Sequence, residues 1–420
     1  MTSFALFRLP HAEQYTLLRQ TSGEPLQLTS PTDLNGRQGF VVSPFAINAD
    51  CPLLLIRPDE VSTLSEKDLS LLVANPEFAV RKLVDCRKET GSLPVGNSQA
   101  RASYAADFEC FHRQLSAGRF RKVVLSRCAV EPRTDAEDPA KLFQRACQLY
   151  PRLFVALTFT PQSGFWLVAT PEILLEDAGD GRIANPPERA NPPERANPPE
   201  RANPPEHANP PERCGIANPP ERCGIANPPE HWWRTIALAG TMKLQGDELQ
   251  GEGEQARWSA KNIEEQRLVA TYIMEQLKPF VANLCEEGPR TVRAANLVHL
   301  RSDFTFTLLY NARIGDLLSA LHPTPAVCGL PKADALRFIL DHEHAPRRYY
   351  SGFMGPLNLR TETSELQRRT SLYVSLRCMQ ILPTEYRLYA GGGLLKGSVE
   401  EQEWMETEAK LETMRQLLRS

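Results

Sequence analysis

The sequence lacks the short motifs by which the common cofactor-binding enzymes are recognised. Its 420 residues contain no GxGxxG, no Walker phosphate loop and no HExxH. Nothing in it therefore predicts a dinucleotide site, a nucleoside triphosphate site or a zinc-protease centre. Ten cysteines occur without a CxxC pair, a pattern typical of scattered reduced thiols rather than of a disulfide framework or a zinc site.

A strong charge and long apolar runs are missing as well. The formal net charge of -3 gives no basic field, so we expect no nucleic-acid partner. The first apolar run is broken by Arg8 and Pro10 and is too short for a signal peptide, and no later run reaches the length of a membrane span. We therefore expect a cytoplasmic protein without a membrane partner. The oligomeric state stays open, and a monomer is compatible with the sequence.

The composition, with 41% hydrophobic and 24% charged residues, is that of a chain able to bury a large core. A helix is predicted from Ser103 to a stop at Gly118, and Ser398 with Glu401 predicts a capping box at the start of a last helix. Strand-like runs such as "KVVLSRCAVE", "TSLYVSLRCMQIL" and "EYRLYAGGG" alternate with helices without a regular βαβ order. The pattern predicts an α+β fold with helices packed outside large antiparallel sheets.

Residues 183–230 form a repeat of seven NPPE units, which hold 14 of the 35 prolines. Paired prolines remove backbone donors, and the units carry too few apolar residues to form a core. Strand-like runs flank the repeat on both sides, so we predict a disordered insert at the tip of a hairpin. The alternative is a docking tract for a proline-reading partner.

Two predicted helices carry acidic residues of interest. Glu265 lies on the apolar stripe of its helix while Glu264 points away from it, and Glu403, Glu406 and Lys410 share one face of the last helix. One interpretation is a solvated charged face with pairing of Glu403 and Lys410. The other is a set of oxygen ligands for a hard cation such as Mg²⁺. Neither helix decides between them alone.

Ten segments occur in the order found in one enzyme family. They are "FRKVVLSR", "ATPEILL", "ALAGT", "KNIEEQ", "VHL", "LHPTPAVCGLP", "RRYYSGFMG", "LRC", "YAGGGL" and "EWMETEAK". With them the chain resembles the chorismate-utilising enzymes, and among these the isochorismate synthases most closely. The resemblance implies one two-lobed domain, in which residues 103–420 are the chorismate-binding catalytic region and residues 1–102 a part of the scaffold.

The resemblance also implies roles for particular residues. Glu265 and Glu406 match the Mg²⁺ ligands, with Glu403 close by. Five positions match those that bind the substrate chorismate, namely Gly240, Thr241, Arg377, Gly391 and Lys410. Lys122 matches the general base and Glu172 the general acid of a reaction in which water adds at C2 while the C4 hydroxyl leaves. Glu172 would have to be kept protonated, most simply by burial.

Differences within the family narrow the expected reaction. Lys122 favours water over ammonia as the nucleophile, and Ala239 stands where covalent aminodeoxychorismate synthases have a lysine. Salicylate synthases share the base and the acid and remain an alternative. A non-catalytic interaction protein that uses the Pro-rich repeat is a second alternative. The family often has Glu-His where this chain has Glu265-Gln266, so we expect altered tuning of the metal ligand. A role in menaquinone or in siderophore biosynthesis is left open.

Overall fold

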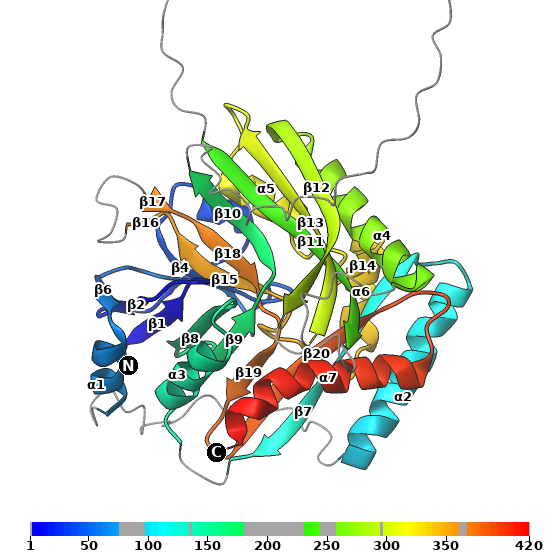
Figure 1. Ribbon diagram of the computed structural model, residues 1–420, viewed down its shortest axis with the longest axis horizontal. Coiled ribbons are helices and arrows are strands. Elements are labelled where there is room, and N and C mark those ends of the chain that lie inside the picture. The colour runs from blue at the N-terminus through cyan, green and yellow to red at the C-terminus, as the bar shows by residue number, and fades with distance from the viewer. Residues whose placement is uncertain are drawn as a thin grey trace, which may run out of the picture.

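The computed structural model (Figure 1) describes residues 2–74, 97–133, 137–179, 231–243, 258–294, 297–360 and 368–419. The NPPE repeat of residues 183–230 lies outside these ranges, so the predicted disorder of the insert stays a prediction. None of the described helices is both long enough and apolar enough to cross a membrane. The seven cysteines in these ranges are free thiols.

Two large antiparallel sheets form the framework. In spatial order the first contains β14 (Gly329–Leu330), β7 (Lys122–Pro132), β20 (Glu385–Leu394), β19 (Cys378–Ile381), β9 (Gly164–Thr170), β8 (Phe154–Thr160), β1 (Ser3–Arg8), β2 (Tyr15–Gln20) and β6 (Glu60–Leu64). The second contains β12 (Val281–Ala294), β13 (Leu297–Leu308), β11 (Trp232–Lys243), β10 (Ile173–Gly179), β18 (Ser371–Val374), β15 (Phe353–Leu357), β4 (Gly39–Ser43), β5 (Leu53–Ile56) and β3 (Leu26–Leu28). A short ribbon of β16 (Leu359–Arg360) and β17 (Arg368–Arg369) completes the described strands.

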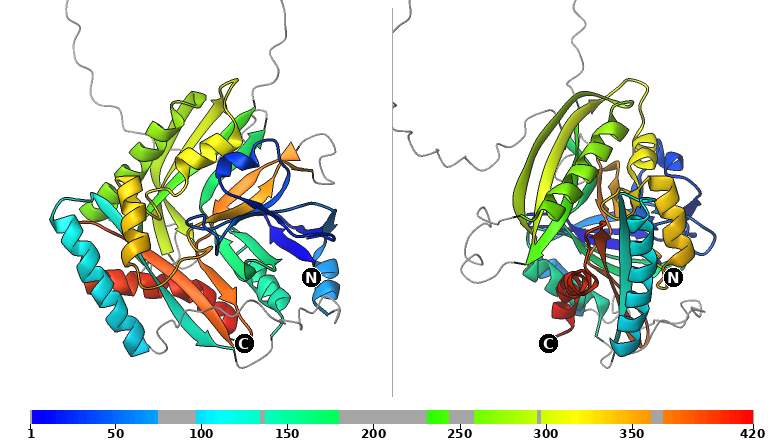
Figure 2. Two further views of the ribbon diagram at one scale, coloured as in Figure 1. Left: turned by 180° about the vertical axis from the view of Figure 1, so that it is seen from behind. Right: turned by 90° about the vertical axis from the view of Figure 1, so that its right-hand side faces the viewer.

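Helices surround these sheets, as the sequence predicts. They are α1 (Glu66–Ala74), α2 (Asn97–Ser116), α3 (Pro139–Leu149), α4 (Ala260–Leu277), α5 (Ile314–Leu321), α6 (Lys332–His342) and α7 (Glu400–Leu418), with a 3₁₀ turn, η1 (Pro31–Leu34). Figure 2 shows α2 and α6 side by side, and a contact between the rings of Phe111 and Phe338 joins them. The α+β prediction is therefore confirmed.

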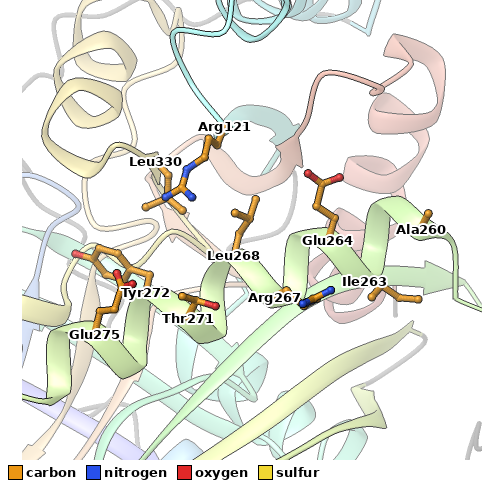
Figure 3. Close-up of a pocket in the computed structure, with 10 residues that line it drawn as sticks. All are labelled: Arg121, Ala260, Ile263, Glu264, Arg267, Leu268, Thr271, Tyr272, Glu275 and Leu330. Carbon is orange, nitrogen blue, oxygen red and sulfur yellow. The ribbon is translucent and has the colours of Figure 1, made fainter.

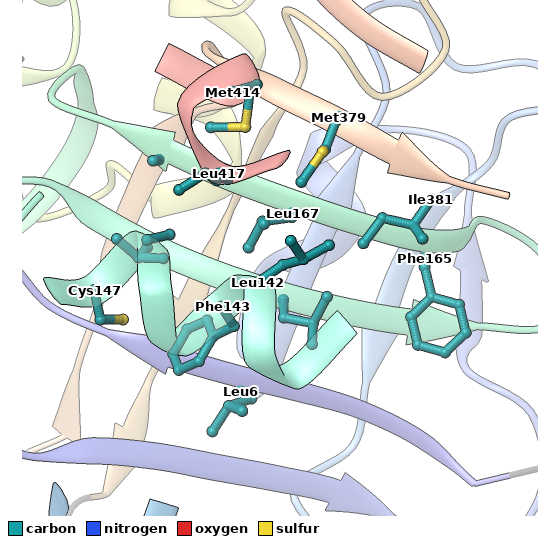
Figure 4. Close-up of a cluster of buried hydrophobic side chains, with 14 of the residues drawn as sticks. Leu6, Leu142, Phe143, Cys147, Phe165, Leu167, Met379, Ile381, Met414 and Leu417 are labelled. Atoms are coloured by element: carbon teal, nitrogen blue, oxygen red, sulfur yellow. The ribbon is translucent and has the colours of Figure 1, made fainter. Parts of the chain in front are cut away.

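The sheets pack face to face over a layer of aromatic and aliphatic side chains. Phe154 of β8 stacks on Tyr373 of β18 with ring centroids 4.2 Å apart, and Phe7 of β1 meets Phe40 of β4 at 5.2 Å. All residues of β8 and β9 are buried, because one face of these strands meets the other sheet and the opposite face meets α3. Figure 4 shows this outer cluster, with Phe143 of α3 close to the first sheet.

The N-terminal residues contribute strands to both sheets. β1, β2 and β6 belong to the first sheet and β3, β4 and β5 to the second. Residues 2–64 thus form an edge of each sheet. The division of the chain at residue 102 remains a prediction.

The strands that flank the insert are paired as predicted. β10 and β11 are antiparallel neighbours, with Glu176 opposite Arg234 and Asp177 opposite Trp233. The insert therefore connects adjacent strands of the second sheet, and their register is fixed by the sheet on both sides of the connection.

Two helix starts differ from the prediction. α2 begins at Asn97, so Ser103 lies inside the helix, whereas its end at Ser116 agrees with the stop at Gly118. α7 begins after Val399 without a side-chain cap. The Ser398 hydroxyl instead accepts a hydrogen bond of 3.0 Å from the Leu395 N–H, so the predicted capping box is wrong.

Candidate active site

The predicted site residues come from both sheets and from two helices, and they meet around one cavity. Seven of the nine predicted residues line it, namely Glu172, Gly240, Thr241, Glu265, Arg377, Gly391 and Lys410. Lys122 and Glu406 join it through ion pairs with Glu265 and Lys410. Figure 1 shows α7 crossing over β20 at this place. The cavity is small, because the volume that the centres of water molecules can reach is about 60 Å³.

Lys122 is the first residue of β7 and has a fully buried side chain, with 0% exposure. Its Nζ lies 2.9 Å from Glu265 Oε1 of α4. Within the described residues this nitrogen makes no hydrogen bond of normal geometry. The amino group of Lys122, with one partner, therefore has hydrogen-bonding capacity left for a further polar atom in the cavity.

Glu172 stands just before β10 and is only 2% exposed. Burial raises the pKa of its carboxyl group from 4.5 to about 7, although the positive charges of Lys122, Arg377 and Lys410 act in the opposite direction. A carboxyl group with such a pKa is protonated in a large fraction of molecules near neutral pH. A carboxyl group in this state can donate a proton.

Arg377 lies between β18 and β19 and is buried in the same cavity wall. Burial lowers its pKa to about 10, although the charge of Glu172 partly offsets this. Its Nη2 is 2.6 Å from Nε2 of His299 on β13. Since a guanidinium group only donates, Nε2 accepts and the ring proton of His299 is on Nδ1, which faces Thr241 Oγ1 at 3.2 Å.

His299 was not among the predicted site residues, although its segment "VHL" was one of the ten matched segments. Burial and the charge of Arg377 hold its pKa well below the usual range, so the ring is neutral. It connects Arg377 with the bulge of β11 at Gly240 and Thr241. At Gly240 the backbone has φ +67°, and a Cβ would lie 3.0 Å from Asn262 O of α4. Glycine is therefore needed for β11 to pack on α4.

Three glutamates and three lysines form a cluster between α4, α7 and β7. Glu265 pairs with Lys122 at 2.9 Å and Glu406 with Lys410 at 2.7 Å. The third pair, between Glu403 and Lys261, is a close contact. Lys410 also donates to the Gly391 carbonyl at 2.8 Å.

The interpretation of a solvated face on the last helix, one of the two left open, is wrong for Glu403. Its side chain is 1% exposed, and its partner is Lys261 of α4 rather than Lys410 of its own helix. α7 packs against the sheet and α4 at this point, so the face with Glu403 points inward. Burial and the nearby Glu406 charge raise the pKa of Glu403, whereas the charges of Lys122, Lys261 and Lys410 hold the pKa of Glu265 below its usual range despite burial.

The carboxylates fit a hard cation by chemistry and position. Glu403 Oε2 is buried and makes no hydrogen bond of normal geometry within the described residues. A Cβ on Gly392 would lie 3.3 Å from this atom and 3.7 Å from Glu406 Oε1, and one on Gly393 would lie 2.1 Å from Glu265 Oε1. The three carboxylates thus approach the backbone of β20 at two positions without side chains, and carboxylate oxygen is the type of ligand that Mg²⁺ prefers.

As the side chains stand, the described part of the chain contains no group of three His, Cys, Asp or Glu residues close enough to hold a metal ion. Each carboxylate is turned to its lysine instead. Two carboxylates with waters are sufficient for Mg²⁺, so a cation bound by Glu265 and Glu406 would replace Lys122 and Lys410 as their partners.

A second hollow, of about 460 Å³, lies on the other side of α4 (Figure 3). It is lined by Glu264, Arg267 and Leu268 of α4 together with Arg121 and Leu330. No predicted site residue lines it. The two faces of α4 are therefore separate, with Glu265 in the site and Glu264 in the outer groove, as the helical period predicts.

Comparisons with known proteins agree with this geometry. Residues 211–419 match the family model described as chorismate binding enzyme. The chain belongs to the chorismate-binding enzyme family. Over 187 residues it is 37% identical to isochorismate synthase MenF of Escherichia coli. The aligned region covers 44% of this chain and 41% of that protein. It is 35% identical to the salicylate biosynthesis isochorismate synthase of Pseudomonas aeruginosa, covering 44% of this chain and 38% of that protein.

The matched part thus spans about two fifths of the length of these curated relatives. Solved structures match over almost the whole chain. An isochorismate synthase from Bacillus anthracis has a TM-score of 0.68 at 19% identity, covering 99% of this chain and 96% of that one. MenF from Escherichia coli has a TM-score of 0.64 at 21% identity, with coverage of 99% and 89%. At these identities the match shows the fold.

Proposed function

We propose that the protein is an isochorismate synthase that converts chorismate to isochorismate with the help of Mg²⁺. One observation supports this most directly. The buried Lys122 and the buried Glu172, whose pKa is raised to about 7, belong to the same site as Arg377, a fork-shaped donor for a substrate carboxylate. The curated relatives named isochorismate synthase add to the support.

The substrate has two carboxylates, and the site offers two places for them. Arg377, held by His299, presents donors on one side, and Lys410 presents a donor beside its partner Glu406. On the other side Glu265 and Glu406, with Glu403 beside them, would hold Mg²⁺. When bound, this ion would supply positive charge against the ring carboxylate. Arg377 is suited to its part because it can donate two parallel hydrogen bonds to one carboxylate.

The reaction needs a base and an acid at different atoms of the ring. Lys122, in its neutral form, would take a proton from the water that adds at C2, and Glu172 would give its proton to the oxygen that leaves C4. After this step Lys122 is protonated and Glu172 is ionised. A proton passed from Lys122 to Glu172 restores both, so the net change is the loss of the C4 hydroxyl as water and the gain of a hydroxyl from another water at C2.

A product analysis tests this proposal. Purified protein would be incubated with chorismate and Mg²⁺, and the products separated by chromatography. Isochorismate alone is the expected product. Salicylate together with pyruvate would instead assign the protein to the synthases that continue to elimination. No reaction by a folded protein would favour the non-catalytic alternative and contradict the proposal.

A further inference from the structure

Lys261 is a charged residue of the carboxylate cluster to which the proposed reaction gives no role. It is the second residue of α4, after the cap at Ser259 whose hydroxyl accepts from the Asn262 N–H. A lysine in the first turn of a helix is opposed by the helix dipole. An acidic partner from outside the helix is therefore needed, and Glu403 of α7 supplies it.

The three lysines of the cluster differ in their surroundings. Lys122 is fully buried among the reacting groups, and Lys410 lines the cavity and binds the Gly391 carbonyl. Lys261 does not line the cavity. Its partner is Glu403, and the charges that raise its pKa against the effect of burial are those of Glu403, Glu406 and Glu265. Among the described residues, Lys261 thus faces the three carboxylates.

The charges of the cluster cancel. When all six groups are ionised, the negative charges of Glu265, Glu403 and Glu406 equal the positive charges of the three lysines. The free protein therefore needs no metal ion to neutralise these carboxylates. A divalent cation that binds there adds its charge to a cluster that is already neutral. It also encounters the ammonium group of Lys261, which is bound to Oε1 of Glu403.

We infer that Lys261 is a built-in counter-ion of the carboxylate cluster, which competes with the divalent cation for Glu403. It holds Oε1 of Glu403, while Oε2 faces Gly392 and Glu406 Oε1. The ammonium group keeps the carboxylates together in the absence of metal and weakens their attraction for it. This inference rests on the proposed cation site.

The test is the affinity for Mg²⁺ measured by titration calorimetry, without chorismate and at alkaline pH, where the carboxylates are charged. Lys261→Met removes the ammonium group and keeps most of the side-chain volume. We expect Mg²⁺ to bind roughly tenfold more tightly to this variant, because one positive charge has left a partly buried cluster. Its melting temperature should also rise more on addition of Mg²⁺ than that of the wild type.

Lys278→Met is the matched control, because Lys278 is exposed at the other end of the same helix. It loses the same charge and should bind Mg²⁺ as the wild type does. Lys261→Gln repeats the test with a polar side chain, and near-ultraviolet circular dichroism checks that each variant is folded. In a Glu403→Gln background Lys261→Met should change the affinity little, since the competition acts through Glu403.

The possible outcomes separate this inference from the proposed function. Wild-type binding that is lost in Glu406→Gln, together with tighter binding in Lys261→Met, supports both. Wild-type binding with an equal or weaker affinity in both Lys261 variants overturns the counter-ion role alone. If neither the wild type nor the Lys261 variants bind Mg²⁺, the cation site and the counter-ion role fail together.

Discussion

The raised pKa of Glu172 predicts an opposite effect of one substitution on stability and on activity. Glu172→Gln keeps the shape of the side chain and removes its ability to ionise. In the wild type the folded-state pKa of about 7 lies above the ordinary value of 4.5. The stability that protonated Glu172 contributes is therefore fully present below about pH 4.5 and is lost as the pH rises through about 7.

The magnitude follows from the shift. The two pKa values differ by about 2.5, and at about 1.4 kcal/mol for each unit this corresponds to about 3.5 kcal/mol. The side chain is buried, so little is subtracted for solvent screening. Above about pH 8 the wild type carries almost the whole cost, whereas the glutamine variant carries none. We therefore expect Glu172→Gln to be more stable than the wild type by about 3.5 kcal/mol at that pH, and equally stable near pH 4.

Urea unfolding at several pH values measures this difference directly. The same variant should lose a factor of about 10² to 10⁴ in turnover, because it cannot protonate the leaving oxygen. A difference in stability that does not change with pH would show that Glu172 does not titrate as the structure indicates. A variant that kept wild-type turnover would exclude Glu172 as the acid.

Four other changes test separate parts of the site. Lys122→Ala should reduce turnover by about 10² to 10⁴ with an unchanged circular dichroism spectrum, and wild-type turnover would exclude it as the base. Glu265→Gln or Glu406→Gln should weaken Mg²⁺ and chorismate binding together in calorimetry. Glu264→Gln, in the outer groove, should change neither. If Glu265→Gln or Glu406→Gln bound Mg²⁺ as the wild type does, the substituted residue would be excluded as a ligand. Gly393→Ala should abolish turnover because its Cβ would lie 2.1 Å from Glu265 Oε1. Gly397→Ala, with open space around it, should be as active as the wild type. Equal turnover by these two variants would contradict the close contact between Gly393 and Glu265. Replacing residues 183–230 by Asn-Gly should preserve turnover and raise the free energy of unfolding by about 2 kcal/mol. Limited proteolysis should cut the parent chain first within or beside these residues. A shortened protein that folds well but is inactive would mean that the repeat contributes to the site.

Local patterns in the sequence predicted the parts of the fold that depend on neighbours in the chain. The helical period placed Glu265 and Glu264 on opposite faces of α4, and turn residues between β-rich runs placed the insert between paired strands. The start of α2 was missed because the residues before Ser103 carry no strong apolar pattern. The pairing of residues 2–64 with both sheets is a long-range property, for which a single sequence has no local pattern.

Long-range contacts in the site were likewise not predictable from the sequence. The matched segments supplied Lys122, Glu172 and Arg377, and the structure brings these residues together. The partner of Glu403 could not be predicted, because Lys261 is 142 residues away in the chain and belongs to another helix. His299 was part of a matched segment, but its contact with Arg377 joins β13 to the turn before β19. Such contacts depend on the packing of elements that the sequence does not place relative to one another.

The identity of the nucleophile tests the central claim most directly. The protein would be incubated with chorismate and Mg²⁺ in water labelled with heavy oxygen, and the product analysed by mass spectrometry. The account predicts isochorismate with one labelled oxygen at C2, slower formation of this product by Lys122→Ala by a factor of about 10² to 10⁴, and no salicylate. Isochorismate without the label, or no product from a folded, Mg²⁺-bound protein, would contradict it.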